Sequence, residues 1–282
     1  MPEGDTIYRT ARTFHKALAG KAVSGFETGV AKLASVDDET PVVGRTVERV
    51  EARGKWCLIV FSGDLILATH MLMSGSWHLY RIGEKWWLPR SRMRVCLTCG
   101  EYQAVAFDVP VAEFHTARSL ERSASLGKLG PYILGEGFSQ EVGLPAFQEY
   151  VQGNPDKEVG VALLDQRALA GLGNVYKSEV AFAAAVNPFR ALRTLTPQEQ
   201  EKLVDAALRM MKANVADGAG EGIVTYRGSR RTTRSMDRGA RLWVYQRKGE
   251  ECRRCGATIQ MQKQGTQARS TYWCPGCQPH IR

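Results

Sequence analysis

Residues 252–277 read CRRCGATIQMQKQGTQARSTYWCPGC and contain four cysteines in a C-x2-C-x18-C-x2-C array. Each C-x2-C pair supplies two thiolates from one tight turn, and two such turns complete the tetrahedral shell of a structural zinc ion. Two disulfides are the alternative, but they require an oxidising compartment, and the chain does not open with a positively charged segment followed by an apolar run. The array therefore predicts one structural zinc ion, bound by Cys252, Cys255, Cys274 and Cys277, that takes no part in chemistry.

The residues between the cysteine pairs have the pattern of a β-hairpin. Residues 260–273 read as two short strands around a turn that contains Gly265. We expect this hairpin to hold Arg269 at a fixed position beside the metal.

Composition limits the class of protein. A chain of 282 residues with 44% apolar content can bury a large core, enough for two domains and a small metal module. No stretch approaches the roughly 18 to 20 apolar residues of a membrane span, so a soluble intracellular protein is expected. The formal charge of +9 and the pI near 9.3 suit a polyanionic partner better than an acidic small molecule.

The N-terminal part combines one helix with many strands. Apolar residues recur there at helical spacing, at Ile7, Ala11, Phe14 and Leu18. Gly20 then offers a stop. From about residue 23 to 111, short apolar runs alternate with turns, as at 57–61, 65–67, 94–97 and 104–107. This spacing predicts a β-sandwich or barrel.

A domain boundary is expected between residues 127 and 143, where five glycines and Pro131 interrupt any periodicity. Beyond it the chain is helical. Residues 196–199 read TPQE, which is a capping box with proline at the first helical position. The apolar face of this helix is expected to run, until Gly218, through Leu203, Ala206, Ala207, Met210 and Met211.

The segment 227–241 contains six arginines and a single acid, Asp237. It has few apolar residues and reads as a mobile loop able to close on phosphates. A solvated basic loop is the alternative.

The start of the chain can supply a catalytic amine. Proline is small enough for the initiator methionine to be removed, which would expose a secondary amine on Pro2. An α-amino group has a pKa of about 8, against about 10.4 for lysine, so an appreciable fraction is nucleophilic at physiological pH. Attack on a sugar C1′ gives an iminium ion that acidifies the C2′ hydrogen and permits loss of the 3′ phosphate, while Glu3 can protonate the ring oxygen. A disordered tip is the alternative, and a helix that begins near Asp5 or Thr6 argues against it.

Five motifs occur in one order along the chain. They are Pro2-Glu3-Gly4, Arg53-Gly54-Lys55, residues 70–77 (HMLMSGSW), residues 169–176 (LAGLGNVY) and the four-cysteine finger. Together they resemble the formamidopyrimidine-DNA glycosylase and endonuclease VIII family of bifunctional base-excision enzymes. The first residues of this chain are more similar to the endonuclease VIII branch of that family. The resemblance spans nearly the whole chain.

The resemblance implies an α+β fold with three parts. We expect a catalytic β-sandwich with an N-terminal helix over residues 1–127, a linker over 128–143, and a helix-two-turn-helix domain that binds DNA over 144–245. A zinc-finger β-hairpin would then occupy residues 246–282. DNA would lie across a basic cleft between the domains.

The resemblance also assigns catalytic roles. Pro2 would be the Schiff-base nucleophile and Glu3 the general acid. Lys55 would approach the sugar-phosphate of the lesion as an electrostatic clamp and proton donor. Without the resemblance, Lys55 reads as a plain surface charge.

Four further residues would contact the DNA. Asn174 matches the phosphate-gripping asparagine of the helix-two-turn-helix element, and free N–H groups at a helix start agree with that role. Arg269 matches the zinc-finger arginine that holds phosphates beside the lesion. Met73 and Leu72 match the apolar loop that fills the gap left by the flipped base. Taken alone, Arg269 reads as a surface cation, and Met73 and Leu72 as core.

Some positions depart from the family pattern. Asp5 and Thr6 replace the second proline-glutamate pair, so the supporting role of that glutamate is in doubt. Gly160 lies where formamidopyrimidine-type members have a lysine that faces the damaged site, which weakens the case for oxidised purines. Residues 114–125 do not clearly show the stack-filling arginine and phenylalanine of the purine branch, although Arg118 and Arg122 are candidates.

The C-x2-C pair Cys96 and Cys99 is a candidate for a second metal site. Neither Cys57 nor the histidines supply a matching pair of ligands, so we interpret Cys96 and Cys99 as strand and turn residues. His70 and His115 are interpreted as hydrogen-bonded structural residues.

The sequence thus predicts a DNA glycosylase with AP lyase activity that removes oxidised pyrimidines and cuts the strand by β,δ-elimination. The expected partner is damaged DNA, and neither a membrane nor an organic cofactor is expected. The protein is expected to be a monomer in the prokaryotic cytoplasm, associated with the nucleoid through DNA. Two alternatives stay open. One is a lyase that acts mainly on abasic or single-stranded DNA, and the other is a non-catalytic protein that binds damaged DNA.

Overall fold

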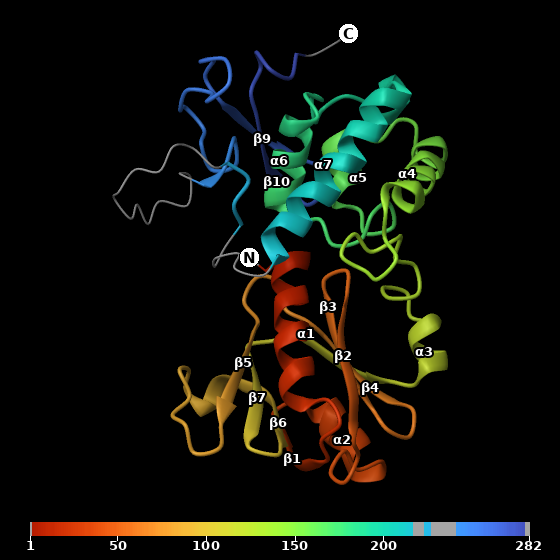
Figure 1. Ribbon diagram of the computed structural model, residues 1–282, viewed down its shortest axis with the longest axis vertical. Helices are drawn as coiled ribbons and strands as arrows, with labels where there is room; N and C mark the ends of the chain where they lie inside the picture. Colours follow the sequence, from red (N-terminus) through yellow and green to blue (C-terminus); the bar gives the residue numbers. More distant parts are fainter. Residues whose placement is uncertain (1, 217–222, 227–240, 280–282) are drawn as a thin grey trace. The chain divides into compact units, whose positions relative to one another are not determined.

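The computed structural model describes residues 2–216, 223–226 and 241–279 and divides the chain into two compact units, residues 1–128 and 129–282 (Figure 1). Met1, Gly218 and residues 227–240, which include most of the arginine-rich segment, lie outside the described residues. The expectations for that segment therefore stay predictions.

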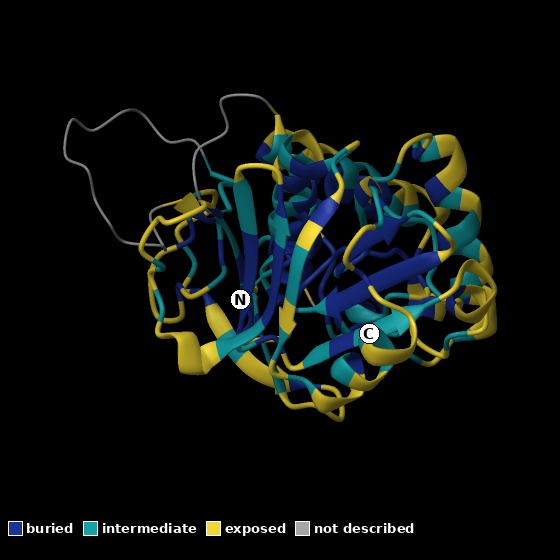
Figure 2. Cartoon of the chain, turned by 90° about the horizontal axis from the view of Figure 1, so that it is seen from below, coloured by how far each residue is buried: buried dark blue, intermediate teal, exposed yellow. Residues whose placement is uncertain are grey.

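The first unit is a sandwich of two antiparallel four-stranded sheets, which confirms the predicted fold class. One sheet has the order β1 (Val23–Thr28), β6 (Met93–Cys99), β7 (Tyr102–Phe107), β5 (Ser76–Arg81). The other has the order β2 (Val47–Arg53), β3 (Trp56–Phe61), β4 (Leu65–His70), β8 (Val111–His115). Buried residues from both sheets form one core. Figure 2 shows the buried stretches of the chain in dark blue.

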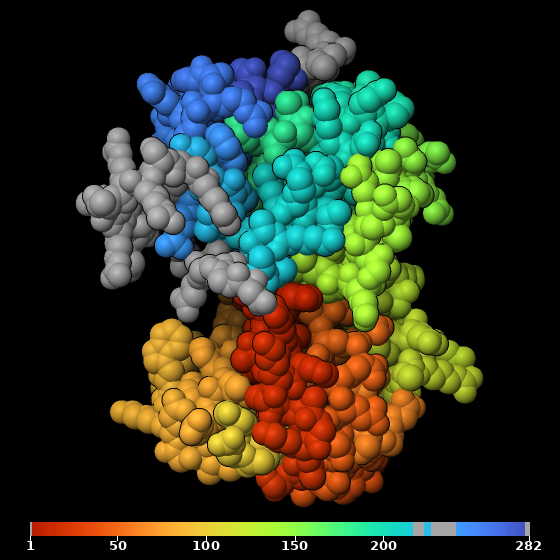
Figure 3. Space-filling view, viewed as in Figure 1, coloured from red at the N-terminus to blue at the C-terminus, as the bar shows by residue number. Residues whose placement is uncertain are grey.

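Helix α1 (Gly4–Leu18) closes one open side of the sandwich. Its buried face consists of the residues that helical spacing predicted, Ile7, Ala11, Phe14 and Leu18. The Phe14 ring meets Trp77 of β5 edge-on at 5.4 Å, and His15 Nδ1 accepts a hydrogen bond from the backbone N–H of Val50 in edge strand β2, at 3.2 Å. The other side of the helix forms part of the surface (Figure 3). Burial of each large side chain stabilises this arrangement by about 1.5 to 3 kcal/mol.

Helix α2 (Ala31–Glu39), which was not predicted, packs against β1 and β8 at the opposite edges. Its sole buried residue among those described is Leu33, so it lacks the wide apolar stripe that reveals a helix in sequence. Two shorter elements follow in the first unit, the 3₁₀ turn η1 (Arg90–Arg92) and helix α3 (Ala117–Glu121).

The turn between β4 and β5 is held by a histidine. His70 Nδ1 accepts a hydrogen bond from the backbone N–H of Leu72 at 3.1 Å, and Gly75 N donates to Met71 O at 2.8 Å. A Cβ at Gly75 would lie 2.8 Å from Met71 O, so this tight turn requires glycine. Leu72 has a φ of +45°, a left-handed backbone that is costly for leucine.

The second unit consists of helices and a two-stranded hairpin. The helical elements are α4 (Gln140–Gly153), α5 (Val159–Leu164), α6 (Asn174–Ala183), η2 (Leu192–Thr194) and α7 (Pro197–Val215). The predicted capping box is present at α7, since Thr196 Oγ1 accepts from Glu199 N at 3.2 Å and Glu199 Oε2 accepts from Thr196 N at 2.8 Å. The hairpin consists of β9 (Gln260–Gln264) and β10 (Arg269–Trp273), as predicted.

Helix α6 packs against α5, α7 and β10 and carries a run of buried polar residues. Lys177, Ser178 and Glu179 are all fully buried. Glu179 accepts backbone N–H bonds from Trp243 and Val244, both at 2.9 Å, from Tyr245 at 2.8 Å, and a hydroxyl hydrogen bond from Thr225. Glu179 therefore fixes residues 243–245, which lead into the zinc finger.

We expect Glu179→Gln to destabilise the protein. The substituted amide would turn an N–H₂ group toward donors that now bond to a carboxylate, which costs about 1 to 3 kcal/mol. Urea unfolding of the two proteins measures the difference, with Glu149→Gln on the exposed face of α4 as the matched control. Equal unfolding midpoints for Glu179→Gln and wild type would show that Glu179 does not fix this segment.

We also expect His70 to make stability depend on pH. Burial and the nearby charge of Lys55 lower the pKa of His70 to about 4, from about 6.5 in an unfolded chain. Between these values the unfolded chain takes up a proton that the folded protein does not, so stability falls as the pH falls through this window. We expect a loss on the order of 1 to 2 kcal/mol, because the ring is only partly buried.

The measurement compares melting temperatures between pH 7 and pH 4.5 for wild type and His70→Asn. Asparagine keeps an acceptor for Leu72 N–H and does not titrate, so the variant should lose less stability than wild type. The pKa of His78 is also lowered by burial. Part of the dependence of stability on pH therefore persists in both proteins. If the melting temperatures of both proteins fell by the same amount between pH 7 and pH 4.5, His70 would not be a source of the pH dependence.

Candidate active site and nucleic-acid interface

The start of α1 and the turn between β2 and β3 lie at the same end of the first unit (Figure 1). Gly20 N donates to Val47 O, and Val50 N donates to His15, so helix and strand run in opposite directions. Gly4 lies about 16 Å back along the helix from His15, and Lys55 lies about 16 Å forward along the strand from Val50. The fold therefore brings the N-terminus level with Lys55.

Pro2 and Glu3 directly precede α1. Pro2 is half-buried. Glu3 is the fully buried N-cap residue, and its backbone carbonyl accepts the first helical hydrogen bond from Ile7 N at 3.1 Å. Asp5, in the first turn, is also fully buried, and its Oδ2 accepts from Arg9 Nη2 at 3.3 Å. The described N-terminus is thus an ordered helix start, contrary to the alternative of a loose tip.

Lys55 lies beside His70 and the exposed turn that follows it. Gly54 has a φ of +63°, which lets β2 turn directly into β3, and Lys55 is the next residue. The register pairs Trp56 with His70, and the charge of Lys55 contributes to the lowered pKa of His70. The sheet thus brings Lys55 close to the turn at residues 71–75.

Leu72 and Met73 project from this turn. They are 48% and 63% exposed, whereas Met71 is buried in the core. Exposed apolar side chains on a turn with a strained backbone suit insertion into another molecule better than packing within this unit. The reading of Leu72 and Met73 as core residues is therefore wrong.

In the second unit, a compact loop joins α5 to α6. Gln166 holds it, because its Nε2 donates to Leu164 O at 2.9 Å and to Leu172 O at 3.0 Å, while its Oε1 accepts from Gly171 N at 3.0 Å. Gly171 has a φ of +112°, and a Cβ there would come within 3.1 Å of the Tyr132 ring. These contacts present the first turn of α6 in a single conformation.

Asp165 holds the beginning of the same loop. Burial alone would raise its pKa, but hydrogen bonds from Arg167, Tyr150 and Lys157 outweigh burial and hold the pKa well below its usual range. The loop is therefore fixed by a carboxylate that stays ionised at neutral pH.

Asn174 is the first residue of α6. It is buried, and its Oδ1 accepts no hydrogen bond from the part of the chain that the structure describes. The N-terminus of a helix carries the positive end of the helix dipole, which attracts anions. This end of α6 can bind an anion such as a phosphate.

Arg269 begins β10, opposite Gln264 in the hairpin register. Its side chain is half-exposed, and its Nε donates to Gln267 Oε1 at 3.1 Å. Because β10 packs against α6, Asn174 and Arg269 belong to directly contacting elements of one unit.

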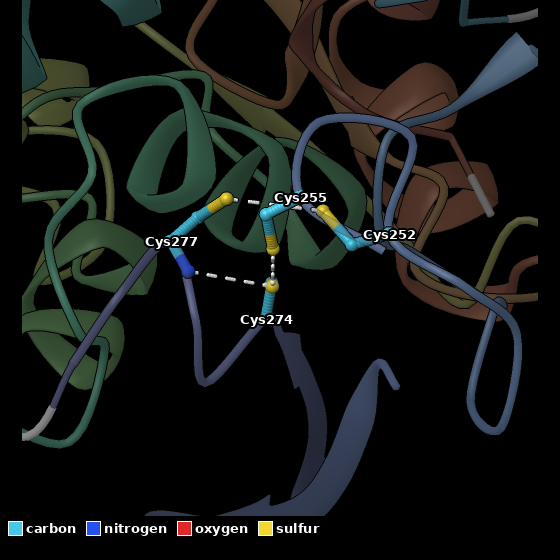
Figure 4. Close-up of side chains that lie close together, drawn as sticks. All are labelled: Cys252, Cys255, Cys274 and Cys277. Atoms are coloured by element: carbon cyan, nitrogen blue, oxygen red, sulfur yellow. Dashed lines mark hydrogen bonds between the residues drawn. The ribbon is translucent and has the colours of Figure 1, made fainter. Parts of the chain in front are cut away.

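The four cysteines converge at the other end of the hairpin strands (Figure 4). The Sγ atoms of Cys252 and Cys277 are 3.8 Å apart, those of Cys255 and Cys274 are 3.4 Å apart, and all four lie within 4.8 Å of one another. A tetrahedral site with zinc–sulfur bonds of about 2.3 Å requires sulfur separations of about 3.8 Å. Disulfide bonds would bring the sulfurs to about 2 Å, so the zinc prediction is confirmed.

The pKa values of two thiols reflect their burial and the close approach of the sulfur atoms. Burial and the neighbouring sulfurs raise the pKa of Cys277, and burial raises that of Cys274. A zinc ion would reverse these shifts by stabilising the thiolates. Gly276 leaves room for this arrangement, since a Cβ there would lie 3.0 Å from Cys255 Sγ.

The other residues considered as metal ligands lie in strands or take part in hydrogen bonds. Cys96 and Cys99 are buried in β6 and belong to no metal-binding cluster among the described residues. His115 is hydrogen-bonded to Ser119 and Glu113. The interpretation of His115 as a hydrogen-bonded residue agrees with the structure.

The sequence did not single out several residues that organise these sites. Gln166 and Asp165 shape the loop before Asn174, and Lys177 and Glu179 tie α6 to segments about 50 to 90 residues further along the chain. Lys177 and Glu179 are visible in the sequence as the two charges of a helix that reads NVYKSEVAFA. Within the described residues, no helix is both long and apolar enough to span a bilayer.

Three family models match the chain in the order of its parts. They are the formamidopyrimidine-DNA glycosylase N-terminal domain at residues 1–110, the formamidopyrimidine-DNA glycosylase H2TH domain at 133–225, and the zinc finger found in FPG and IleRS at 249–279.

Curated relatives match over almost their full length. A probable endonuclease 8 2 of Streptomyces coelicolor is 37% identical, over 99% of this chain and 94% of that protein. The DNA-(apurinic or apyrimidinic site) lyase Nei2 of Mycolicibacterium smegmatis is 34% identical over 99% of both chains. A formamidopyrimidine-DNA glycosylase of Cytobacillus firmus is 30% identical, over 99% of this chain and 100% of that protein.

A solved structure has the same fold. The formamidopyrimidine-DNA glycosylase of Lactococcus lactis, bound non-covalently to DNA with an AP site, superimposes with a TM-score of 0.79 at 23% identity, over 99% of this chain and 100% of that one. By its sequence relatives and its three matched domains, this chain belongs to the formamidopyrimidine-DNA glycosylase and endonuclease VIII family.

Proposed function

We propose that this protein is a bifunctional DNA glycosylase and AP lyase of base excision repair that removes oxidised pyrimidines and cuts the strand by β,δ-elimination. The observation that carries the proposal is the ordered start of α1, which places Pro2 next to the fully buried Glu3 at the same end of the sandwich as Lys55. The family relationship supports the same reaction class.

The first stage of the reaction replaces the base by the protein. The lone pair of the Pro2 amine forms a bond to C1′ of the damaged nucleotide, and the bond from C1′ to the base breaks. The base leaves with its electron pair and takes up the proton that the amine gives up. Glu3 donates a proton to the ring oxygen, so the bond from C1′ to that oxygen breaks and an iminium ion forms. A secondary amine suits this step, because its iminium ion has no N–H proton to lose.

The second stage cuts the strand. Loss of a proton from C2′ sends electrons toward the iminium, and the bond to the 3′ phosphate breaks with the phosphate as leaving group. A second elimination releases the 5′ phosphate, and water then hydrolyses the iminium to free Pro2. Lys55 is proposed to hold the sugar-phosphate and to donate a proton during these steps.

DNA contacts are proposed for both units. Asn174 and Arg269 would bind phosphates, and Leu72 and Met73 would occupy the space that the flipped nucleotide leaves in the stack. The zinc ion, bound by the four cysteines, would hold the hairpin that carries Arg269 and would take no part in the chemistry.

The pyrimidine preference rests on two observations. The relatives named endonuclease 8 are 34% to 37% identical, against 30% for the Cytobacillus firmus formamidopyrimidine-DNA glycosylase. The resemblance implies a lysine in the purine branch at the position of Gly160, and a Cβ at Gly160 would lie 2.3 Å from Gln264 Oε1. We further propose that the protein acts as a monomer without an organic cofactor, on DNA in the bacterial cytoplasm.

A second candidate function is that of a lyase acting mainly on abasic DNA. It is favoured by the name of the Mycolicibacterium smegmatis relative, which describes only lyase action at apurinic or apyrimidinic sites. The two functions share the Pro2 chemistry and differ in whether the intact damaged base is removed.

We expect wild-type protein to form a borohydride-trapped adduct with duplexes that carry dihydrouracil or an abasic site, and to form less with 8-oxoguanine. Pro2→Gly should lose the dihydrouracil adduct, because its amine is no longer secondary. Glu3→Gln should keep more activity on the abasic duplex than on dihydrouracil, because an abasic sugar opens without displacement of a base. Adduct yield on denaturing gels measures each case, with the mature N-terminus confirmed by mass.

Each outcome assigns a function. An adduct confined to the abasic duplex would favour the lyase alternative. If wild type formed no adduct on any of the three duplexes, the enzymatic proposal would fail, and a binding protein would be the better account.

A further inference from the structure

Lys177 is a fully buried cation on the second turn of α6. Its Nζ donates to Thr271 Oγ1 at 2.6 Å and to Ser270 O at 3.1 Å, and both acceptors belong to β10. A buried ammonium is costly unless its hydrogen bonds are satisfied and its charge is compensated. A methionine of similar volume would fill the same space without that cost, so packing alone does not explain a lysine here.

The charge of Lys177 is compensated through a chain of hydrogen bonds. Thr271 accepts from Lys177 and donates its own hydroxyl proton to Gln264 Oε1 at 2.8 Å. Gln264 Nε2 then donates to Glu158 Oε2 at 2.9 Å and to Pro188 O at 2.8 Å. Along this path every donor points from the ammonium toward the carboxylate, so the dipoles strengthen one another. Lys177, Thr271 and Gln264 are buried, and Glu158 at the end of the path is half-buried.

Gly160 makes room for this chain. A Cβ at this position would lie 2.3 Å from Gln264 Oε1 and 3.1 Å from its Nε2. Any side chain at Gly160 would therefore displace the amide that links Thr271 to Glu158. Glycine at this position therefore leaves the amide of Gln264 in place.

The chain connects the two residues proposed to grip phosphates. Thr271 lies two residues after Arg269 on the same strand, and Gln264 is the direct cross-strand partner of Arg269. Asn174 lies one turn before Lys177 on α6. The hydrogen bonds thus fix the strand that carries Arg269 to the helix that carries Asn174.

We propose that Lys177 is a positioning residue that sets the distance and orientation between Arg269 and Asn174, so that both can bind one DNA backbone. The inference rests on the proposed DNA-binding function. Lys177 acts through Arg269 and does not itself touch DNA. Loss of its charge should weaken DNA binding without slowing chemistry on bound DNA.

The test is a double-mutant cycle between Lys177→Met and Arg269→Ala, measured with abasic duplex DNA on the full-length, zinc-loaded protein. We expect Lys177→Met to raise Kd and KM about tenfold, as for a hydrogen bond to a charged group, with kcat unchanged within about twofold. In the Arg269→Ala background, the same substitution should change Kd less than about twofold, because Arg269 is then already lost.

Thr271→Val supplies a second variant in case Lys177→Met does not fold. It removes one hydroxyl at nearly constant volume, interrupts the chain in the middle, and should reproduce the rise in Kd. Lys212→Met, on the exposed side of α7, controls for loss of a positive charge and should leave Kd within about twofold of wild type after correction for salt. Zinc content and melting temperature establish that each variant is folded.

Three results would overturn the proposal: an unchanged Kd for both folded variants, an equal rise in Kd with and without Arg269, or a fall in kcat at constant Kd. The second result would indicate a general structural role for Lys177. If wild type bound abasic DNA but did not cleave it, the proposed enzymatic function would fail while the Kd cycle still tested Lys177. If wild type cleaved normally and the variants matched it, only the positioning role would fail.

Discussion

The second unit depends on polar side chains that α6 buries. Lys177, Ser178 and Glu179 lie in the core, where unsatisfied polar groups would be expensive, and each meets partners far along the chain. Lys177 and Ser178 bond to β10, since Ser178 Oγ accepts from Tyr272 N at 3.2 Å, while Glu179 accepts from residues 243–245. One helix thus fixes both the hairpin and the segment that leads into it.

This constraint holds in place the hairpin that carries Arg269, for which a DNA contact is proposed. The zinc ion holds the far end of the hairpin strands through sulfur ligands, and α6 holds the end near Arg269 through hydrogen bonds. In the first unit, α1 fixes the positions of Pro2 and Glu3, and the β2–β3 turn fixes the position of Lys55. In both units, rigid elements present side chains whose proposed roles require fixed geometry.

Short-range patterns predicted most of the fold. The cysteine spacing gave the metal site, the period of Ile7 to Leu18 gave α1, and TPQE gave the start of α7. Helix α2 was missed because one buried leucine leaves no amphipathic signal. The chain from Lys177 to Glu158 could not be predicted, because it joins residues up to 113 positions apart that meet only after folding. The role proposed for Met73 and Leu72 comes from the family resemblance and not from periodicity, since an apolar run by itself indicates a core.

The central claim is that the amine of Pro2 is the nucleophile. It is tested most directly by proteolysis and mass spectrometry of the borohydride-reduced complex formed on a dihydrouracil duplex. The account predicts that the sugar remnant is attached to the nitrogen of an N-terminal peptide that begins with Pro2. Attachment to a lysine side chain such as Lys55, or to a peptide that retains Met1, would contradict it.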